Sequence, residues 1–377
     1  MSDPTTNPMR RLGDSGLKRA GGIIQEEWLP ELRGAQGRRV IRQMTDQDPI
    51  IGGILFAIEM LLRRTTWQIQ PASDTPDDVA ASAFVAEAFA NLRPAWRATL
   101  PELLSFLPWG WAVMEIIYAR DAAGRTVWSG WDIRAQDTLD RWEFDEAGTP
   151  VAMIQAVPNS TRVARIPLSK AIHVTTTSRK GNPEGRPLLR NAYRSWYFKG
   201  RIENIEGVGI ERDLAGLPVA FVPPELLAGT LTPEDQGVYN AIVEIVTNIR
   251  RDEQEGVVWP LAYDANGNKT YDLQLLSTGG SRQFDTGAII ARYGAQIAMS
   301  VLADFLMLGH EQTGSFALSA DKTELFTVAL GAWLDSISSA LETQACIPLL
   351  ALNGMPGAVR VEHGSIERAD LGVLGVY

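Results

Sequence analysis

One segment, residues 180–223, constrains the fold more than any other part of the chain. It opens with a glycine and proline turn, continues through aromatic and basic residues, becomes acidic, and ends in a second turn. As a helix over 187–213 it would be roughly 40 Å long, which exceeds the average helix of a globular protein. The sequence therefore predicts an unusually long helix here.

Charge follows this predicted helix in the order opposite to the one that the helix dipole favours, with bases early and acids late. A neighbouring copy displaced along the axis would place its acidic half beside this basic half, and heterologous contacts of this kind close into rings. A solvated helix with locally paired charges is the alternative. The residues predicted to form a subunit interface are Arg186, Arg190, Arg194, Lys199, Arg201, Glu203, Glu206 and Glu211.

Length and composition indicate a folded protein of several parts. The 377 residues exceed the size at which one core usually stops growing, and 45% hydrophobic with 21% charged residues is typical of globular chains. The formal charge of −10 argues against a general electrostatic attraction to DNA or to anionic lipid. The N-terminus lacks the apolar core of a signal peptide, and no apolar run approaches the ~18 residues of a membrane span. Cytoplasmic synthesis and no membrane partner are expected.

The predicted elements define an α+β protein. Helices are expected at 48–64 and 75–92, the second with Thr75 as its N-cap. The middle of the chain is expected to form antiparallel strands, with turns at Gly124 and Gly148. Residues 1–40 are polar, glycine-rich and basic, which predicts a loosely ordered arm that docks onto something.

The second half of the chain is predicted to place a small α/β unit between longer helices. A helix at 232–251 precedes two strands around an Asn266-Gly267 turn. A helix at 284–308 carries one apolar stripe, and after an interruption another helix runs over 321–345 with Leu325 and Val328 inward. The chain after 353 reads as a short glycine-rich tail.

The sequence contains no recognisable catalytic apparatus. Phosphate-loop, dinucleotide, zinc-helix and paired-cysteine motifs are all missing, and His173, His310 and His363 lie far apart in sequence. We therefore predict no catalytic residues, no metal and no cofactor. His173 is expected to be a structural strand residue, Cys346 a buried free thiol, and the tryptophans at 109, 111, 128, 131 and 142 core residues.

Three stretches resemble bacteriophage portal proteins, most closely the phage Mu type. "GNPEGRPLLRNAYRSWYFKGRIENIEGVGIERDLAGLPV" is similar to the family's aromatic helix with its glycine-proline start. "PWGWAVMEIIYARDAAGRTVWSGWDIR" is similar to its Gly-aromatic-x-x-Glu strand and hairpin, and "GHEQTGSFALSADKTELF" to its Gly-Ser-x-Ala-Leu stretch. The resemblance implies a ring, usually of twelve subunits, at a capsid vertex through which double-stranded DNA enters and leaves.

The resemblance also implies a portal-like subunit with an antiparallel β/helical wing, long stem helices and a small inserted α/β clip. The implied parts are an N-terminal arm (1–44), wing (45–180), first stem helix (181–217), clip (218–278), second stem helix (279–308), tunnel loop (309–320), wing helix (321–352) and a short tail or reduced crown (353–377). The residues expected to face DNA are Glu311, Gln312, Thr313 and Ser315.

The implied partners are further copies of the chain, the DNA in the channel, the terminase large subunit, a head–tail adaptor and the major capsid protein. The implied location is the portal vertex of the virion. Two alternatives stay open at this point. One is a head–tail connector or another ring-forming virion protein, and the other is a metal-dependent hydrolase with a site assembled from scattered Asp, Glu and His residues.

Overall fold

The computed structural model describes residues 13–215, 217–227, 231–248, 259, 262–263, 266–276, 285–301, 303 and 316–366. The fold is mixed α and β, as predicted. The chain divides into two compact units. Unit 1 combines Met1–Trp196 with Gly294–Tyr377, and unit 2 is Tyr197–Tyr293.

Unit 1 begins with a short hairpin and a helix where we predicted a loosely ordered arm. That prediction was wrong for the described part, because residues 34–47 form a regular helix whose buried face includes Ile41 and Met44. Asp48 then starts the next helix by accepting hydrogen bonds from the amides of Ile50 (2.9 Å) and Ile51 (3.1 Å). The elements are β1 Arg19–Ala20, β2 Ile23–Ile24, η2 Pro30–Leu32, α1 Gly34–Gln47 and α2 Pro49–Arg63.

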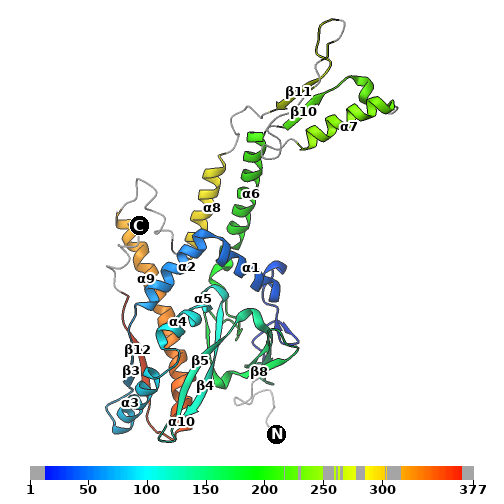
Figure 1. Ribbon diagram of the computed structural model, residues 1–377. Helices are drawn as coiled ribbons and strands as arrows, with labels where there is room; N and C mark the ends of the chain where they lie inside the picture. Colours follow the sequence, from blue (N-terminus) through cyan, green and yellow to red (C-terminus); the bar gives the residue numbers. More distant parts are fainter. Residues whose placement is uncertain are drawn as a thin grey trace. The chain divides into compact units, whose positions relative to one another are not determined.

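Two three-stranded antiparallel sheets occupy the middle of unit 1 (Figure 1), in the orders β5-β4-β9 and β6-β7-β8. Both predicted hairpin turns are confirmed, since Gly124 and Gly148 each have a φ of 80°, a conformation that favours glycine. The strands are β4 Trp111–Arg120, β5 Thr126–Arg134, β6 Leu139–Phe144, β7 Pro150–Ala156, β8 Val163–Pro167 and β9 Ala171–Thr175. Two short 3₁₀ turns, η3 Gln136–Thr138 and η4 Leu168–Lys170, connect them.

Helices and tryptophans build the main core beside these strands. The helix predicted at 75–92 is confirmed, with the Thr75 hydroxyl accepting from the Asp78 amide at 3.3 Å. Trp131 contacts the rings of Trp96 and Trp128 edge-on, at centroid distances of 5.9 and 5.0 Å. Four of the five predicted core tryptophans are buried, whereas Trp109 is partly exposed. The helices are α3 Pro76–Ala90, α4 Trp96–Leu104 and α5 Phe106–Trp109.

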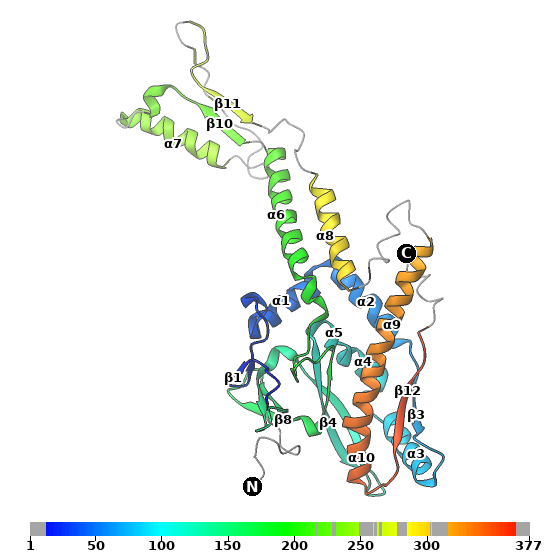
Figure 2. The same cartoon turned by 180° about the vertical axis from the view of Figure 1, so that it is seen from behind.

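The C-terminal part of unit 1 differs from the prediction in three respects (Figure 2). Helix α9 Phe316–Leu341 starts earlier than 321, so residues 316–320 of the predicted tunnel loop are helical. Leu325 and Val328 are 60% and 65% exposed rather than inward, because the buried stripe follows Phe326, Leu330 and Leu334.

The third difference is a strand in the predicted tail, β12 Val359–His363, which pairs antiparallel with β3 Trp67–Pro71. Between α9 and this strand the chain forms a π-helical turn, Glu342–Cys346, and then α10 Ile347–Leu352. Pro348 supplies a reason for that turn, because proline has no amide hydrogen and its ring clashes with the carbonyl of the preceding turn.

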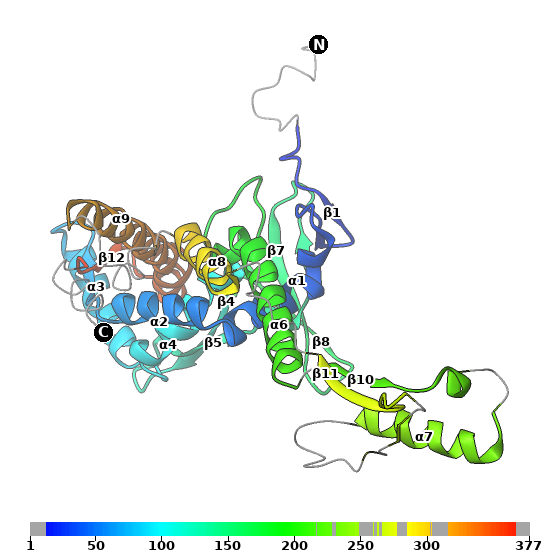
Figure 3. The same cartoon turned by 90° about the horizontal axis from the view of Figure 1, so that it is seen from above.

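Unit 2 contains parts of two helices that lie side by side (Figure 3), where Phe198 stacks on Tyr293 at 6.3 Å. The two strands predicted around Asn266-Gly267 were only partly right. The described residues there form one isolated bridge, Tyr263 to Lys269, and β11 pairs instead with β10. The elements from η5 onward are η5 Leu188–Asn191, α6 Tyr193–Ala215, β10 Leu217–Phe221, η6 Pro224–Leu227, α7 Pro233–Asn248, β11 Asp272–Leu276 and α8 Thr286–Ser300.

Candidate functional site

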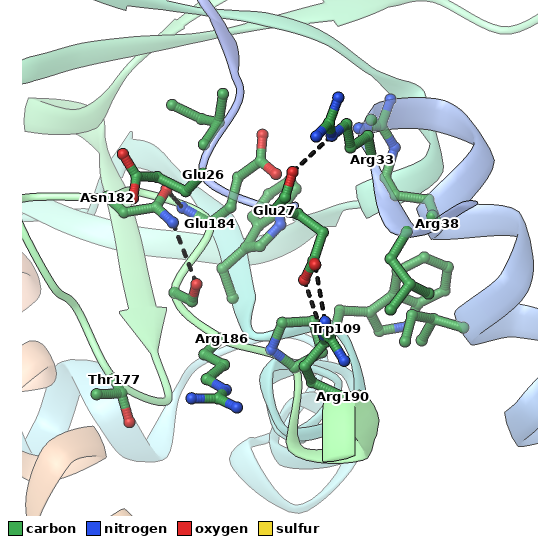
Figure 4. Close-up of a pocket in the computed structure, with 18 of the residues that line it drawn as sticks. Glu26, Glu27, Arg33, Arg38, Trp109, Thr177, Asn182, Glu184, Arg186 and Arg190 are labelled. Carbon is green, nitrogen blue, oxygen red and sulfur yellow. Dashed lines mark hydrogen bonds and ion pairs between the residues drawn. The ribbon is translucent and has the colours of Figure 1, made fainter. Parts of the chain in front are cut away.

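A cavity of about 370 Å³ lies in unit 1 between the N-terminal segment and the loop that precedes α6 (Figure 4). We call residues 17–33 the strap and residues 176–190 the pocket loop. The strap, the start of α1 and the pocket loop supply most of the lining, and Trp109 and Trp111 complete it. The cavity therefore joins segments about 150 residues apart in sequence.

Close backbone contact explains the glycines that shape the pocket loop. Gly185 has a φ of +54°, and a Cβ atom there would lie 2.2 Å from the Gly110 carbonyl oxygen. Gly110 has a φ of +91°, and a Cβ atom on it would lie 2.6 Å from the Glu184 carbonyl oxygen. Neither position accommodates a side chain without displacing backbone. The glycines of this turn therefore allow the pocket loop to lie in direct backbone contact with the end of α5.

Ion pairs hold the strap against the pocket loop. The Glu27 carboxylate accepts hydrogen bonds from Nε and Nη2 of Arg190, the latter at 2.8 Å, and Figure 4 shows this two-pronged contact. Glu26 accepts from the Lys18 amide at 2.6 Å and pairs with Lys180 at 3.0 Å. These contacts fix the strap to the residues that lead directly into α6.

Two of the strap carboxylates, Glu26 and Glu27, are ionised more readily than usual. Burial by itself would raise the pKa of Glu27, but the Arg190 guanidinium and the Leu29 amide outweigh it and hold that pKa below its ordinary value. The Lys18 amide is the main cause of the lowered pKa of Glu26. Both residues therefore keep the charge that their ion pairs require.

A second charged pair lies deeper in the cavity without a direct ion pair. Arg38 Nη2 donates to the Leu139 carbonyl at 2.8 Å, and Glu184 accepts from the Trp142 indole at 3.2 Å. Surrounding protein raises the pKa of Glu184 and lowers that of Arg38, since burial penalises both charged forms. Arg38 Nε is buried and has no hydrogen-bond partner among the described residues.

Several predicted interface residues of α6 and the pocket loop have partners within their own chain. Arg190 binds Glu27, and Lys199, whose side chain is 4% exposed, pairs with Glu203 at 3.2 Å. This Lys199–Glu203 contact is the local charge pairing that we kept as an alternative. Arg201 lies over the Tyr197 ring at 5.2 Å.

The remaining predicted interface residues lie in the pocket loop and on α6. Arg194 is exposed on α6, and Arg186 Nη2 donates to the Asn191 side chain at 2.8 Å. Glu206 accepts a hydrogen bond from the Thr286 hydroxyl of α8. Glu211 belongs to α6, but its side chain lies outside what the structure describes. The structure thus spreads the predicted set along η5 and α6 rather than gathering it into one cluster.

The residues predicted to face DNA, Glu311, Gln312, Thr313 and Ser315, all lie outside the described residues, as does His310. His173 is a structural strand residue, as predicted, with Nε2 2.8 Å from the Pro183 carbonyl oxygen. Cys346 is buried, also as predicted, and burial raises the pKa of its thiol to about 12.

Sequence reasoning missed the strap. The signal that could have revealed it is the pair of acids next to Trp28, in a segment whose other charges are mostly basic. Within the described part of the chain, no three His, Cys, Asp or Glu side chains gather as metal ligands do. The same part contains no helix with the length and apolarity that a membrane crossing requires.

Comparisons with known proteins identify the fold and the family. A chain from the "neck of empty GTA particle computed with C6 symmetry" superposes with a TM-score of 0.57 at 13% identity, over 89% of this chain and 87% of that one. A chain from the virion of the native gene transfer agent particle gives a TM-score of 0.58, also at 13% identity, over 94% and 89%. These likenesses establish a shared fold.

A family model described as the portal protein of Mu bacteriophage matches residues 38–372, which is most of the chain. The match includes both three-stranded sheets, α6, unit 2 and α9. The strap lies before it. The chain belongs to the family of the portal protein of Mu bacteriophage.

Proposed function

We propose that this protein forms a ring at one vertex of a phage capsid and serves as the conduit for double-stranded DNA during packaging and ejection. The observation that carries the proposal is the family match over residues 38–372. Its proposed partners are the terminase large subunit, a head–tail adaptor and the major capsid protein. The proposed role is structural rather than enzymatic, with the virion as its final location.

Exposed apolar side chains on α6 support assembly with further copies. Ile205 and Val208, one turn apart on one face of α6, are 64% and 47% exposed, and neighbouring exposed apolar side chains on a soluble chain favour an interaction surface. A neighbouring copy would remove them from water, at about 25 cal/mol per Å² of apolar surface covered. The parts of the proposal that follow the domain scheme of wing, stem helices and clip rest on the family resemblance.

Twelve is the proposed number of subunits. The structural neighbour with C6 symmetry is compatible with it, because a ring of twelve identical subunits also obeys six-fold symmetry. Twelve copies at −10 each give a charge of −120, from 12 × −10. An acidic ring suits a conduit, since each phosphate neutralised by Lys or Arg adds affinity that would slow the passage of duplex.

We also propose that Glu311, Gln312, Thr313 and Ser315 approach the duplex through weak polar contacts. Of the predicted interface residues, the exposed Arg186 and Arg194 are the basic residues that we propose to join subunits. Arg190 and Lys199 are less suited to that role, because their side chains are only 17% and 4% exposed.

Negative-stain microscopy of the purified protein tests the ring, and annuli with a central hole are the expected result. Val208→Asp is expected to abolish annuli, because it places a charge on the apolar face of α6. Val163→Asp is the matched control, since Val163 is 58% exposed on β8 of unit 1. A chain that stays monomeric at every concentration, or annuli that Val208→Asp leaves intact, would contradict the proposal or its interface respectively.

A further inference from the structure

The cavity between the strap and the pocket loop has no role in the conduit as proposed above. One of its walls consists of residues before position 38, including Glu26, Trp28 and Arg33, where the family match has not yet begun. That wall is a feature of this chain beyond the matched family region. Its chemistry therefore has to be interpreted from its own residues.

The mouth of the cavity carries positive charge that the described residues do not neutralise. Five arginines and three glutamates line the cavity. Glu26 is committed to Lys180 and Glu27 to Arg190. Arg179 and Arg186 are exposed and make no ion pair among the described residues. In a chain of net charge −10, this local excess of cations favours an anionic occupant.

The cavity also presents apolar surface that an occupant could cover. Trp28 is 73% exposed, with the Arg190 guanidinium 5.9 Å from its ring centre. Trp109, Ile24 and Ile41 add apolar lining. The occupant that fits has acidic groups next to an apolar side chain.

We propose that this cavity is the receiving half of an interface between copies, and that an exposed acidic segment of the next copy docks in it. Arg179 and Arg186 bind the carboxylates of that segment, and Trp28 covers an apolar side chain beside them. The strap, held by Glu26 and Glu27, forms the wall that the neighbour contacts. This proposal rests on the proposed function for the arrangement of copies in a ring.

A peptide segment suits the cavity better than DNA does. The site is concave and combines apolar and aromatic side chains with charged ones, whereas a duplex is bound through a basic surface that follows its phosphates. Glu26, Glu27 and Glu184 in the lining would repel a continuous run of phosphates, whereas Arg179 and Arg186 can bind one or two carboxylates. A protein segment is therefore the occupant.

Two observations favour a second copy over a different protein. Ring closure by heterologous contacts requires one surface of a subunit to meet a different surface of the next, and a chain of charge −10 offers acidic surface to a cationic mouth. In addition, a partner that covers Trp28, which is 73% exposed, would remove a large aromatic ring from water. A ring provides such a partner for every copy.

Site-specific photo-crosslinking identifies the occupant directly. Trp28 is replaced by p-benzoylphenylalanine in the full chain, and the irradiated protein is examined by denaturing electrophoresis and mass spectrometry. The expected result is a ladder of covalent multimers in which the benzoylphenylalanine at position 28 is joined to an acidic segment of a second copy. Crosslinks to DNA alone, to a different protein alone, or to nothing would overturn the proposal.

A charge-reversed variant measures how much the arginines at the mouth of the cavity contribute to ring assembly. Arg179→Glu with Arg186→Glu is expected to raise the concentration needed for ring assembly roughly tenfold or more, because two attractive contacts become repulsive. The matched control is Arg97→Glu with Arg162→Glu, which makes the same charge change at exposed positions outside the cavity. All four positions are exposed, so the melting temperature of the monomer is expected to stay unchanged in both variants.

The outcomes separate this inference from the ring itself. If annuli form but the crosslink is missing and the reversed variant assembles normally, the docking proposal fails and the ring stands. If Trp28 crosslinks to a second copy while no annulus forms, the docking stands and the ring fails.

Discussion

The two units of the chain bury their apolar side chains to different degrees. Unit 1 has a large tryptophan-rich core, and its distant segments are joined by side chains that bind backbone. In unit 2, the buried hydrophobic residues among those described are Leu226 and Ile242. Its exposed ones are Tyr197, Phe198, Ile205, Val208, Ile210, Phe221, Leu227, Val238, Val243 and Tyr263.

This difference shows where each unit obtains its stability. A unit with a core of its own can fold alone, whereas a unit that leaves most of its apolar side chains in water gains stability when other chains cover them. Unit 1 therefore behaves as the self-sufficient part of the subunit. Unit 2 is the part whose stability we expect to depend on assembly.

The largest effect is expected at the centre of the unit 1 core. Trp131→Ala removes a side chain that is 2% exposed and contacts three aromatic rings. It should lower the free energy of unfolding by about 3 to 5 kcal/mol. Chemical denaturation of the assembly-deficient Val208→Asp background measures this. Ile242→Ala in unit 2 should leave that transition in place, and an equal shift from both changes would show that the two units unfold as one.

Acid should destabilise unit 1 because it contains the buried His173, whereas unit 2 contains no histidine. Burial lowers the pKa of His173 to about 4, whereas the unfolded side chain titrates near 6.5. The unfolded state therefore binds more protons between these values, and the free energy of unfolding falls as the pH drops from 6.5 to 4, by on the order of 3 kcal/mol.

Measuring stability across this pH range in His173→Gln tests the assignment, because the variant should lose most of the slope. His363→Gln alters the other described histidine and is the control. An unchanged slope in His173→Gln would assign the acid sensitivity to other groups.

A smaller loss is expected where the π-helical turn meets the sheet. The Gln344 amide accepts from the His173 amide at 2.6 Å and donates to the His173 carbonyl at 3.1 Å, so it occupies part of the open edge of β9. Gln344→Ala should cost about 1 to 3 kcal/mol, because it leaves partly buried backbone groups unpaired. Thr343→Ala, which removes an exposed hydroxyl one residue away, should cost much less in the same thermal melt.

The smallest effect on the isolated subunit is expected from Ile205→Ser. Ile205 is 64% exposed on α6, and changes at such positions usually stay within about 0.5 kcal/mol. The same change should weaken ring assembly, which sedimentation at several protein concentrations would detect. A large loss of monomer stability would mean that unit 2 has more of its own core than its described residues show.

Local chemistry made parts of unit 1 predictable from the sequence. Thr75 with Pro76, Asp48 with Pro49, and the glycines at 124 and 148 each specify a helix start or a turn through contacts within a few residues. The tryptophan core followed from composition and strand pattern. Apolar periodicity was less reliable for α9. Leu325 and Val328 fit an apolar stripe, but the buried stripe is the adjacent one, which follows Phe326, Leu330 and Leu334.

The sequence by itself determined the mixed α and β class, the long helix, both hairpin turns and the resemblance that the family match confirmed. The tertiary structure alone decided that β12 pairs with β3, that Gln344 covers the edge of β9, and that the strap closes a cavity against the pocket loop. The physical reason is how far apart in sequence the interacting residues lie. Caps and turns depend on neighbouring residues, whereas Glu27 and Arg190 are 163 positions apart and meet only because the whole of unit 1 has folded between them.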